Sequence, residues 1–183
     1  AEMSIAAAAG MEESNHSYVH GTGWITSQWT VYWLGDMSIN STEDYKFGFY
    51  SSDAYSWDAI AYNAPYYLIV KAGGNDRNHD YSGEHKHADG TIQNDYHEPD
   101  GGTDHYDCIP DRGVAKNILT VGAVEKVLNY ISPSDVVMSN FSSWGPADDG
   151  RIKPDLVAKG VNTYSAYSAH DSEYRYISGT SMA

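Results

Sequence analysis

The sequence lacks features on which several classes of protein depend. Its single cysteine, Cys108, can close no disulfide within the chain and excludes a zinc site of several cysteines. The longest apolar runs, residues 5–9 and 66–70, fall far short of the roughly 20 residues that a membrane helix needs. Lysine and arginine number only 11 against 25 aspartate and glutamate residues. The net charge of −14 therefore disfavours nucleic acid and anionic membranes as partners.

What is present indicates a globular protein. The chain has 183 residues, about the length of one domain, and 41% of them are hydrophobic. It contains 5 tryptophans, 16 tyrosines and 3 phenylalanines, more aromatic surface than a disordered chain carries. We expect one domain or a large part of one.

The hydrophobic patterns predict helices that alternate with strands. An alanine-rich helix is expected over residues 1–12, and a second helix begins near Ser51 and ends before Pro65. Strands are expected at 14–19, 66–70, 118–124, 155–158 and 161–166, with an aromatic-anchored loop or irregular strands over 20–50. Because continuous apolar strands between helices are typical of a parallel sheet, we predict an α/β fold whose strand 66–70 is covered on both faces.

Residues 73–112 form a long polar segment with five of the eight histidines, and we predict a structureless loop there. His85 and His87 could bind a transition metal, but a solvated loop is the favoured interpretation. Asp76, Asn78 and Asp80 alternate like the start of a calcium loop, although the EF-hand pattern fails further on.

Ser181 lies among small residues where a helix could begin. A serine oxygen that attacks a carbonyl there would have its developing negative charge stabilised by backbone N–H groups. A simple helix cap would have the same local sequence, so this segment alone does not distinguish a catalytic serine from a helix cap.

Several motifs together resemble one family. GTSMA occupies residues 179–183, AGGN occupies 72–75 after a strand, and SNHSY occupies 14–18; further similar segments lie at 115–123, 141–146 and 153–156. Their order resembles that of the subtilisin-like serine proteases, the subtilases. The resemblance implies a three-layer α/β sandwich with a mostly parallel, doubly wound sheet, of which this chain would be an incomplete part.

The resemblance also implies roles for individual residues. Ser181 would be the nucleophile, and the Asn75 side chain and the Ser181 N–H would stabilise the oxyanion. Substrate would bind along Ser17, Tyr18, Val19, Gly73 and Gly74. Val19 stands where the family usually has glycine, which should narrow the pocket, and the additional glycine Gly74 should loosen its turn.

The sequence departs from the family pattern in the catalytic triad of Asp, His and Ser. Subtilases carry their catalytic residues in the order Asp, His, Ser, and no segment of the expected histidine type precedes residue 14. We expect the Asp and His to lie upstream of Ala1, so that residues 1–183 are a partial catalytic domain and inactive alone. The alternative is a rearranged triad that uses His16 or His20.

The resulting hypothesis is a secreted serine endopeptidase that acts on polypeptides and is a monomer when complete. Catalysis should need no cofactor; structural calcium would suit the family, at an unknown site. A non-catalytic domain that binds peptide or carbohydrate, or serves as a scaffold, is the main alternative. An esterase of the α/β-hydrolase type is poorly supported, because Ala183 stands where its motif needs glycine. Cys108 is expected to be a free small residue and not a nucleophile.

Overall fold

The computed structural model describes residues 2–18 and 20–183. Its central feature is a parallel sheet in the order β1-β4-β7-β8. The strands are β1 (Glu13–His16), β4 (Leu68–Ala72), β7 (Leu119–Val124) and β8 (Leu156–Lys159). The predicted parallel α/β fold is confirmed: β4, β7 and β8 lie within two residues of their expected bounds, and β1 ends three residues before the end of its expected range, 14–19.

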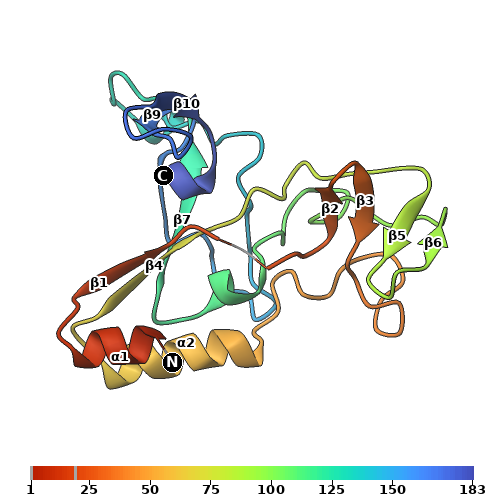
Figure 1. The fold of residues 1–183 in the computed structure, drawn as a ribbon, viewed down its shortest axis with the longest axis horizontal. Coiled ribbons are helices and arrows are strands. Elements are labelled where there is room, and N and C mark those ends of the chain that lie inside the picture. Colours follow the sequence, from red (N-terminus) through yellow and green to blue (C-terminus); the bar gives the residue numbers. More distant parts are fainter. Residues whose placement is uncertain (1, 19) are drawn as a thin grey trace.

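Two helices lie side by side at one end of this sheet (Figure 1). They are α1 (Glu2–Ala8) and α2 (Ser52–Asn63). The Ser51 hydroxyl caps α2 by accepting hydrogen bonds from the backbone N–H groups of Asp53 and Ala54. Trp57 of α2 and Ile69 of β4 belong to one buried core cluster, so α2 is fixed against the sheet.

The predicted coverage of residues 66–70 on both faces is wrong for part of that run. Ile69 is fully buried, but Tyr66 is 90% exposed and Leu68 43% exposed. Tyr66 precedes β4, whereas Tyr67 and Ile69 belong to the buried core cluster. The pattern of apolar residues could not distinguish these positions, because burial depends on which elements pack against the strand.

Residues 73–112 are not a structureless loop. They contain β5 (His85–His87) and β6 (Ile92–Gln93), which join β2 (Trp24–Ser27) and β3 (Thr30–Trp33) in a second sheet of order β2-β3-β5-β6. β5 pairs in parallel with β3, with Trp33 beside His87. Figure 1 shows this sheet set to one side of β1, β4 and β7.

The remaining strands form an antiparallel pair, β9 (Thr163–Ala166) and β10 (Tyr174–Ile177). Three short 3-10 turns complete the description: η1 (Asp111–Val114), η2 (Pro133–Asp135) and η3 (Thr180–Met182). Ser181 lies within η3, which follows β10 and contacts β7. No helix among the described residues is long and apolar enough to cross a membrane.

Candidate active site

Three segments that are distant in sequence meet beyond the carboxyl ends of the parallel strands. Ser17 follows β1, Asn75 follows β4, and Ser181 arrives after β10. The Ser181 hydroxyl donates to the Ser17 carbonyl at 3.3 Å, and the Ser17 hydroxyl donates to the Ser181 carbonyl at 3.2 Å. Ligands of open α/β sheets bind at this edge.

The Asn75 side chain is oriented by the residue before Ser181. Its Oδ1 atom accepts from the Thr180 N–H at 2.9 Å and from the Thr180 hydroxyl at 3.1 Å. Thr180 is itself buried, so this contact is held in place. With Oδ1 occupied, the Nδ2 group is left as the donor of Asn75.

Gly74 makes the turn between β4 and Asn75 tight. Its φ of +111° favours glycine, and an added Cβ would lie 2.6 Å from the Ser143 hydroxyl and 2.7 Å from an Asp76 carboxylate oxygen. Its N–H donates to the Thr180 hydroxyl at 3.2 Å, and its carbonyl accepts from the Ser143 N–H at 3.0 Å. The expectation that Gly74 loosens the turn is therefore wrong, because its surroundings fix it on both sides.

A pocket of about 580 Å³ opens beside Ser181. Its lining comes from the segment after β1, from β2 and β3, from the turn after β4 and from η3: Ser17, Tyr18, Trp24, Ile25, Thr26, Val31, Ala72, Gly74, Asn75, Asp76, Asn78, His79, Asp80, Tyr81, Thr180 and Ser181. The predicted binding residues Ser17, Tyr18 and Gly74 thus line it, whereas Gly73 does not. Val19 lies outside the described residues.

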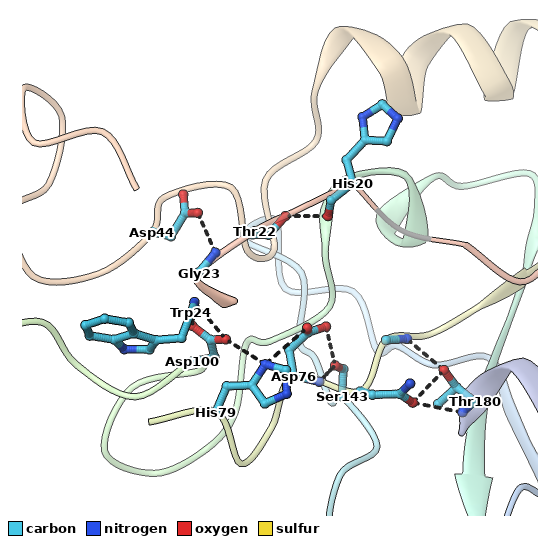
Figure 2. Close-up of polar contacts among 12 residues, drawn as sticks. His20, Thr22, Gly23, Trp24, Asp44, Asp76, His79, Asp100, Ser143 and Thr180 are labelled. Atoms are coloured by element: carbon cyan, nitrogen blue, oxygen red, sulfur yellow. Dashed lines mark hydrogen bonds and ion pairs between the residues drawn. The ribbon is translucent and has the colours of Figure 1, made fainter. Parts of the chain in front are cut away.

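One wall of the pocket carries a network of two buried carboxyl groups and a histidine. Figure 2 shows His79 between Asp76 and Asp100, with Nδ1 3.7 Å from Asp76 Oδ1 and 3.5 Å from Asp100 Oδ2. Burial raises the pKa of Asp100 to about 7 and also raises the pKa of Asp76. The hydrogen bond to Asp100 raises the pKa of His79. The Trp24 N–H donates to Asp100, so the network also anchors the start of β2.

The histidines proposed for a rearranged triad have other partners. His16 Nε2 lies 2.8 Å from the Ser14 hydroxyl, and its Nδ1 lies 2.7 Å from the Tyr18 hydroxyl. His20 Nε2 lies 2.9 Å from an Arg112 guanidinium nitrogen. Within residues 2–18 and 20–183, no histidine nitrogen is hydrogen-bonded to the Ser181 hydroxyl.

Cys108 is fully buried, and burial raises the pKa of its thiol to about 11. A thiol in this state is protonated near neutral pH and a poor nucleophile. This environment agrees with the prediction of an inert small residue.

The sequence interpretation missed a second cluster of side chains, which could bind a metal ion. His85, His87, Asp95 and His97 converge in the second sheet, and the three histidines are buried. The favoured solvated loop is therefore wrong for His85 and His87, since β3 and β5 pair and remove both rings from water. The alternation of HKH at 85–87 and DYH at 95–97 was the available signal.

Comparison with known proteins identifies the family. The model of the subtilase family, a family of serine-type peptidases, matches residues 3–183. The chain therefore belongs to the subtilase family.

Several curated proteases are similar over part of the chain. Serine protease AprX of Bacillus subtilis is 38% identical over an alignment of 87 residues, and the match covers 41% of this chain and 20% of AprX. C5a peptidase of Streptococcus pyogenes is 42% identical over 69 residues, 38% of the chain and 6% of that protein. Pyrolysin of Pyrococcus furiosus is 36% identical over an alignment of 90 residues, and the match covers 39% of the chain and 6% of that protein. The matched regions are thus a small part of each relative.

The fold is also similar to a solved structure, the PatG macrocyclase in complex with peptide. The TM-score is 0.50 at 16% sequence identity, and the match covers 100% of this chain and 36% of that one. At this sequence identity the structural similarity supports the fold alone.

Proposed function

We propose that this protein is a serine endopeptidase in which Ser181 is the nucleophile. The Ser181 oxygen attacks a peptide carbonyl carbon and loses its proton to a base. The carbonyl oxygen becomes an oxyanion, the C–N bond breaks as the amine takes up the proton, and an acyl-enzyme forms that water hydrolyses. Family membership supports the proteolytic class.

One observation carries the proposal: Thr180 holds Asn75 by its Oδ1 atom immediately beside Ser181. The free donor of Asn75 is then available to an oxygen of a substrate bound in the pocket. A fixed donor of this kind stabilises a developing negative charge without reorganisation. The Ser181 N–H is proposed as the second donor.

The substrate is proposed to be a polypeptide that lies along Ser17, Tyr18 and the turn 73–75. These segments line or flank the pocket next to Ser181, and the structurally similar PatG macrocyclase was solved with a peptide. Secretion is proposed from the acidic composition and the habit of the family. A monomeric state of the complete enzyme remains part of the same proposal.

We further propose that the histidine base and its aspartate come from residues outside this chain. The support is the absence of a histidine partner for the Ser181 hydroxyl within the described residues. A serine hydroxyl without a base is a weak nucleophile.

The test is hydrolysis of a fluorogenic protein substrate by the full-length protein that carries this chain. Ser181→Ala should reduce kcat by about 10⁶-fold, the loss known for the nucleophile of a subtilisin. Ser168→Ala, at an exposed serine away from the pocket, is the matched control and should leave kcat unchanged. Equal activity of the wild type and Ser181→Ala would refute the role of Ser181. A wild type that binds peptide without cleaving it would favour a binding domain.

A further inference from the structure

Four side chains of the second sheet point at a common centre. His85 and His87 come from β5, and Asp95 and His97 follow β6. The Asp95 Oδ1 atom lies 3.3, 3.0 and 3.5 Å from the Nε2 atoms of His85, His87 and His97, respectively. The Nε2 atoms of His87 and His97 are 3.2 Å apart. All four ligand atoms lie within 4.8 Å of one another.

These distances match the edges of a metal coordination tetrahedron. With zinc–nitrogen and zinc–oxygen bonds of about 2.0–2.2 Å, neighbouring ligand atoms in a tetrahedron are about 3.3 Å apart. The four measured separations run from 3.0 to 3.5 Å. Four of the six edges of such a tetrahedron are therefore near their metal-bound lengths, and the other two separations are within 4.8 Å.

Backbone carbonyls orient two of the rings. The Gly83 carbonyl lies 2.8 Å from His85 Nδ1, and the Ser41 carbonyl lies 2.8 Å from His97 Nδ1. Because a carbonyl only accepts, each Nδ1 carries a proton, which leaves Nε2 as the nitrogen of each ring that can offer a lone pair to the centre. Histidines that bind metals are commonly oriented in this way.

One of these lone pairs lacks a hydrogen-bond partner. The His85 side chain is 0% exposed, and its Nε2 atom has no hydrogen bond, although Asp95 is 3.3 Å away. Buried polar atoms without a partner are rare because their desolvation is not compensated. The His97 side chain is also 0% exposed, whereas the Asp95 side chain is 36% exposed, so solvent reaches the cluster from the side of Asp95.

Two tryptophans form the walls of the cluster. The Trp33 ring stacks on His97 with a centroid distance of 3.6 Å and an interplanar angle of 2°. The Trp24 ring meets His85 edge-on at 4.8 Å. Trp24 also lines the pocket beside Ser181, so the cluster supports one wall of that pocket.

We propose that His85, His87, Asp95 and His97 bind a structural zinc ion. Three imidazoles and one carboxylate oxygen are ligands that zinc accepts in tetrahedral geometry, and four protein ligands leave no open position for catalysis. Calcium is a poor fit, since it takes six to eight oxygen ligands. The ion holds β5 and the segment after β6 together and fixes the rings against Trp24 and Trp33. The inference does not depend on the proteolytic function.

The test measures zinc content and affinity in the purified protein after removal of metal and reloading with zinc chloride. The wild type should bind one zinc per chain, and cobalt(II) in its place should give the intense visible absorption of tetrahedral cobalt. His87→Ala should weaken zinc binding by more than about 100-fold, because a direct ligand matters more than the outer contacts that change affinity 10–100-fold. Zinc should also raise the melting temperature of the wild type.

Three further variants separate ligand loss from misfolding. Asp95→Asn keeps the size of a side chain that is 36% exposed and should weaken zinc binding at least about tenfold. Asp89→Asn, in the same hairpin but outside the cluster, and His170→Ala, at an exposed histidine, should bind zinc like the wild type. The proposal is overturned if the wild type binds no stoichiometric zinc, if calcium competes equally, or if Asp95→Asn and Asp89→Asn bind zinc alike.

Discussion

The cluster around Ser181 and the histidine cluster are assembled in opposite ways. Ser17, Asn75 and Ser181 come from three segments spread over the whole chain, and the Ser181 hydroxyl has no histidine partner among the described residues. The four side chains of the histidine cluster lie within residues 85–97, and their ligand atoms lie within 4.8 Å of one another. In the proposed reaction the first arrangement takes its base from outside the chain, whereas the second holds all four ligands of the proposed ion.

The largest expected effect tests this difference directly. The 183-residue chain should bind zinc but cleave no peptide, because loss of the histidine base alone costs about 10⁶-fold in kcat in a subtilisin. Parallel measurements of zinc content and of fluorogenic peptide hydrolysis check the expected zinc binding and the expected lack of cleavage. Hydrolysis by the chain alone, at a rate that Ser181→Ala abolishes, would show that a residue within the chain supplies the base.

The next effect concerns the oxyanion donor. In the full-length protein, Asn75→Ala should lower kcat by about 10²–10³-fold, the size known for the equivalent donor of a subtilisin, with little change in KM. The reason is that this hydrogen bond strengthens mainly in the transition state. Steady-state kinetics on a peptide substrate measure kcat and KM. Asn78→Ala, on the same pocket wall, is the control. A raised KM with kcat unchanged would assign Asn75 to ground-state binding instead.

The carboxyl network gives a smaller effect that depends on pH. The pKa of Asp100 is about 7 in the folded protein, against about 3.9 for an unperturbed aspartate. Between these values the unfolded chain binds fewer protons than the folded one, so stability falls as pH rises, by up to about 1.4 kcal/mol per pH unit. The raised pKa of His79 acts in the same direction, because the stability from its charged form is also lost as pH rises.

Asp100→Asn removes one titrating group from this network. Its free energy of unfolding should therefore change less between about pH 5 and pH 7 than that of the wild type. Urea unfolding at several pH values measures the slope, and Asp80→Asn, at an exposed pocket residue, serves as the control. Identical slopes for the wild type and Asp100→Asn would mean that Asp100 ionises normally.

The smallest effect connects the two regions through Trp24. Loss of zinc in Asp95→Asn should loosen Trp24 and raise KM for a peptide about three- to tenfold, roughly 1 kcal/mol, while kcat stays within about twofold. The reason is that Trp24 lines the pocket but makes no hydrogen bond to Ser181 or Asn75. Kinetics of the full-length protein with and without added zinc provide the measurement. A fall in kcat as large as that of Asn75→Ala would contradict the separation of the two regions.

The sequence predicted the Ser181 region better than the histidine region for a physical reason. GTSMA at 179–183 and AGGN at 72–75 are local motifs, and AGGN follows the strand that the hydrophobic pattern predicted at 66–70. The burial of His85 and His97 depends instead on nonlocal partners: β3, the Ser41 carbonyl and Trp33. No pattern within residues 73–112 contains those contacts.

The strands and turns of the fold also differ in whether the local sequence predicts them or distant contacts determine them. The parallel strands β4 and β7 were predictable from their continuous apolar runs. β10 was not, because YRYI at 174–177 is largely exposed and is a strand only through its pairing with β9. Gly74 was misjudged because its φ of +111° and the neighbouring Ser143 are visible only in the folded chain.

The central claim is that Ser181 is the nucleophile of an endopeptidase. Its most direct test is the reaction of the full-length protein with a fluorophosphonate, followed by mass spectrometry of its peptides. The account predicts one covalent adduct, located on Ser181, that is absent in Ser181→Ala and forms more slowly in Asn75→Ala. An adduct on another residue, or none in a protein that still cleaves peptides, would contradict it.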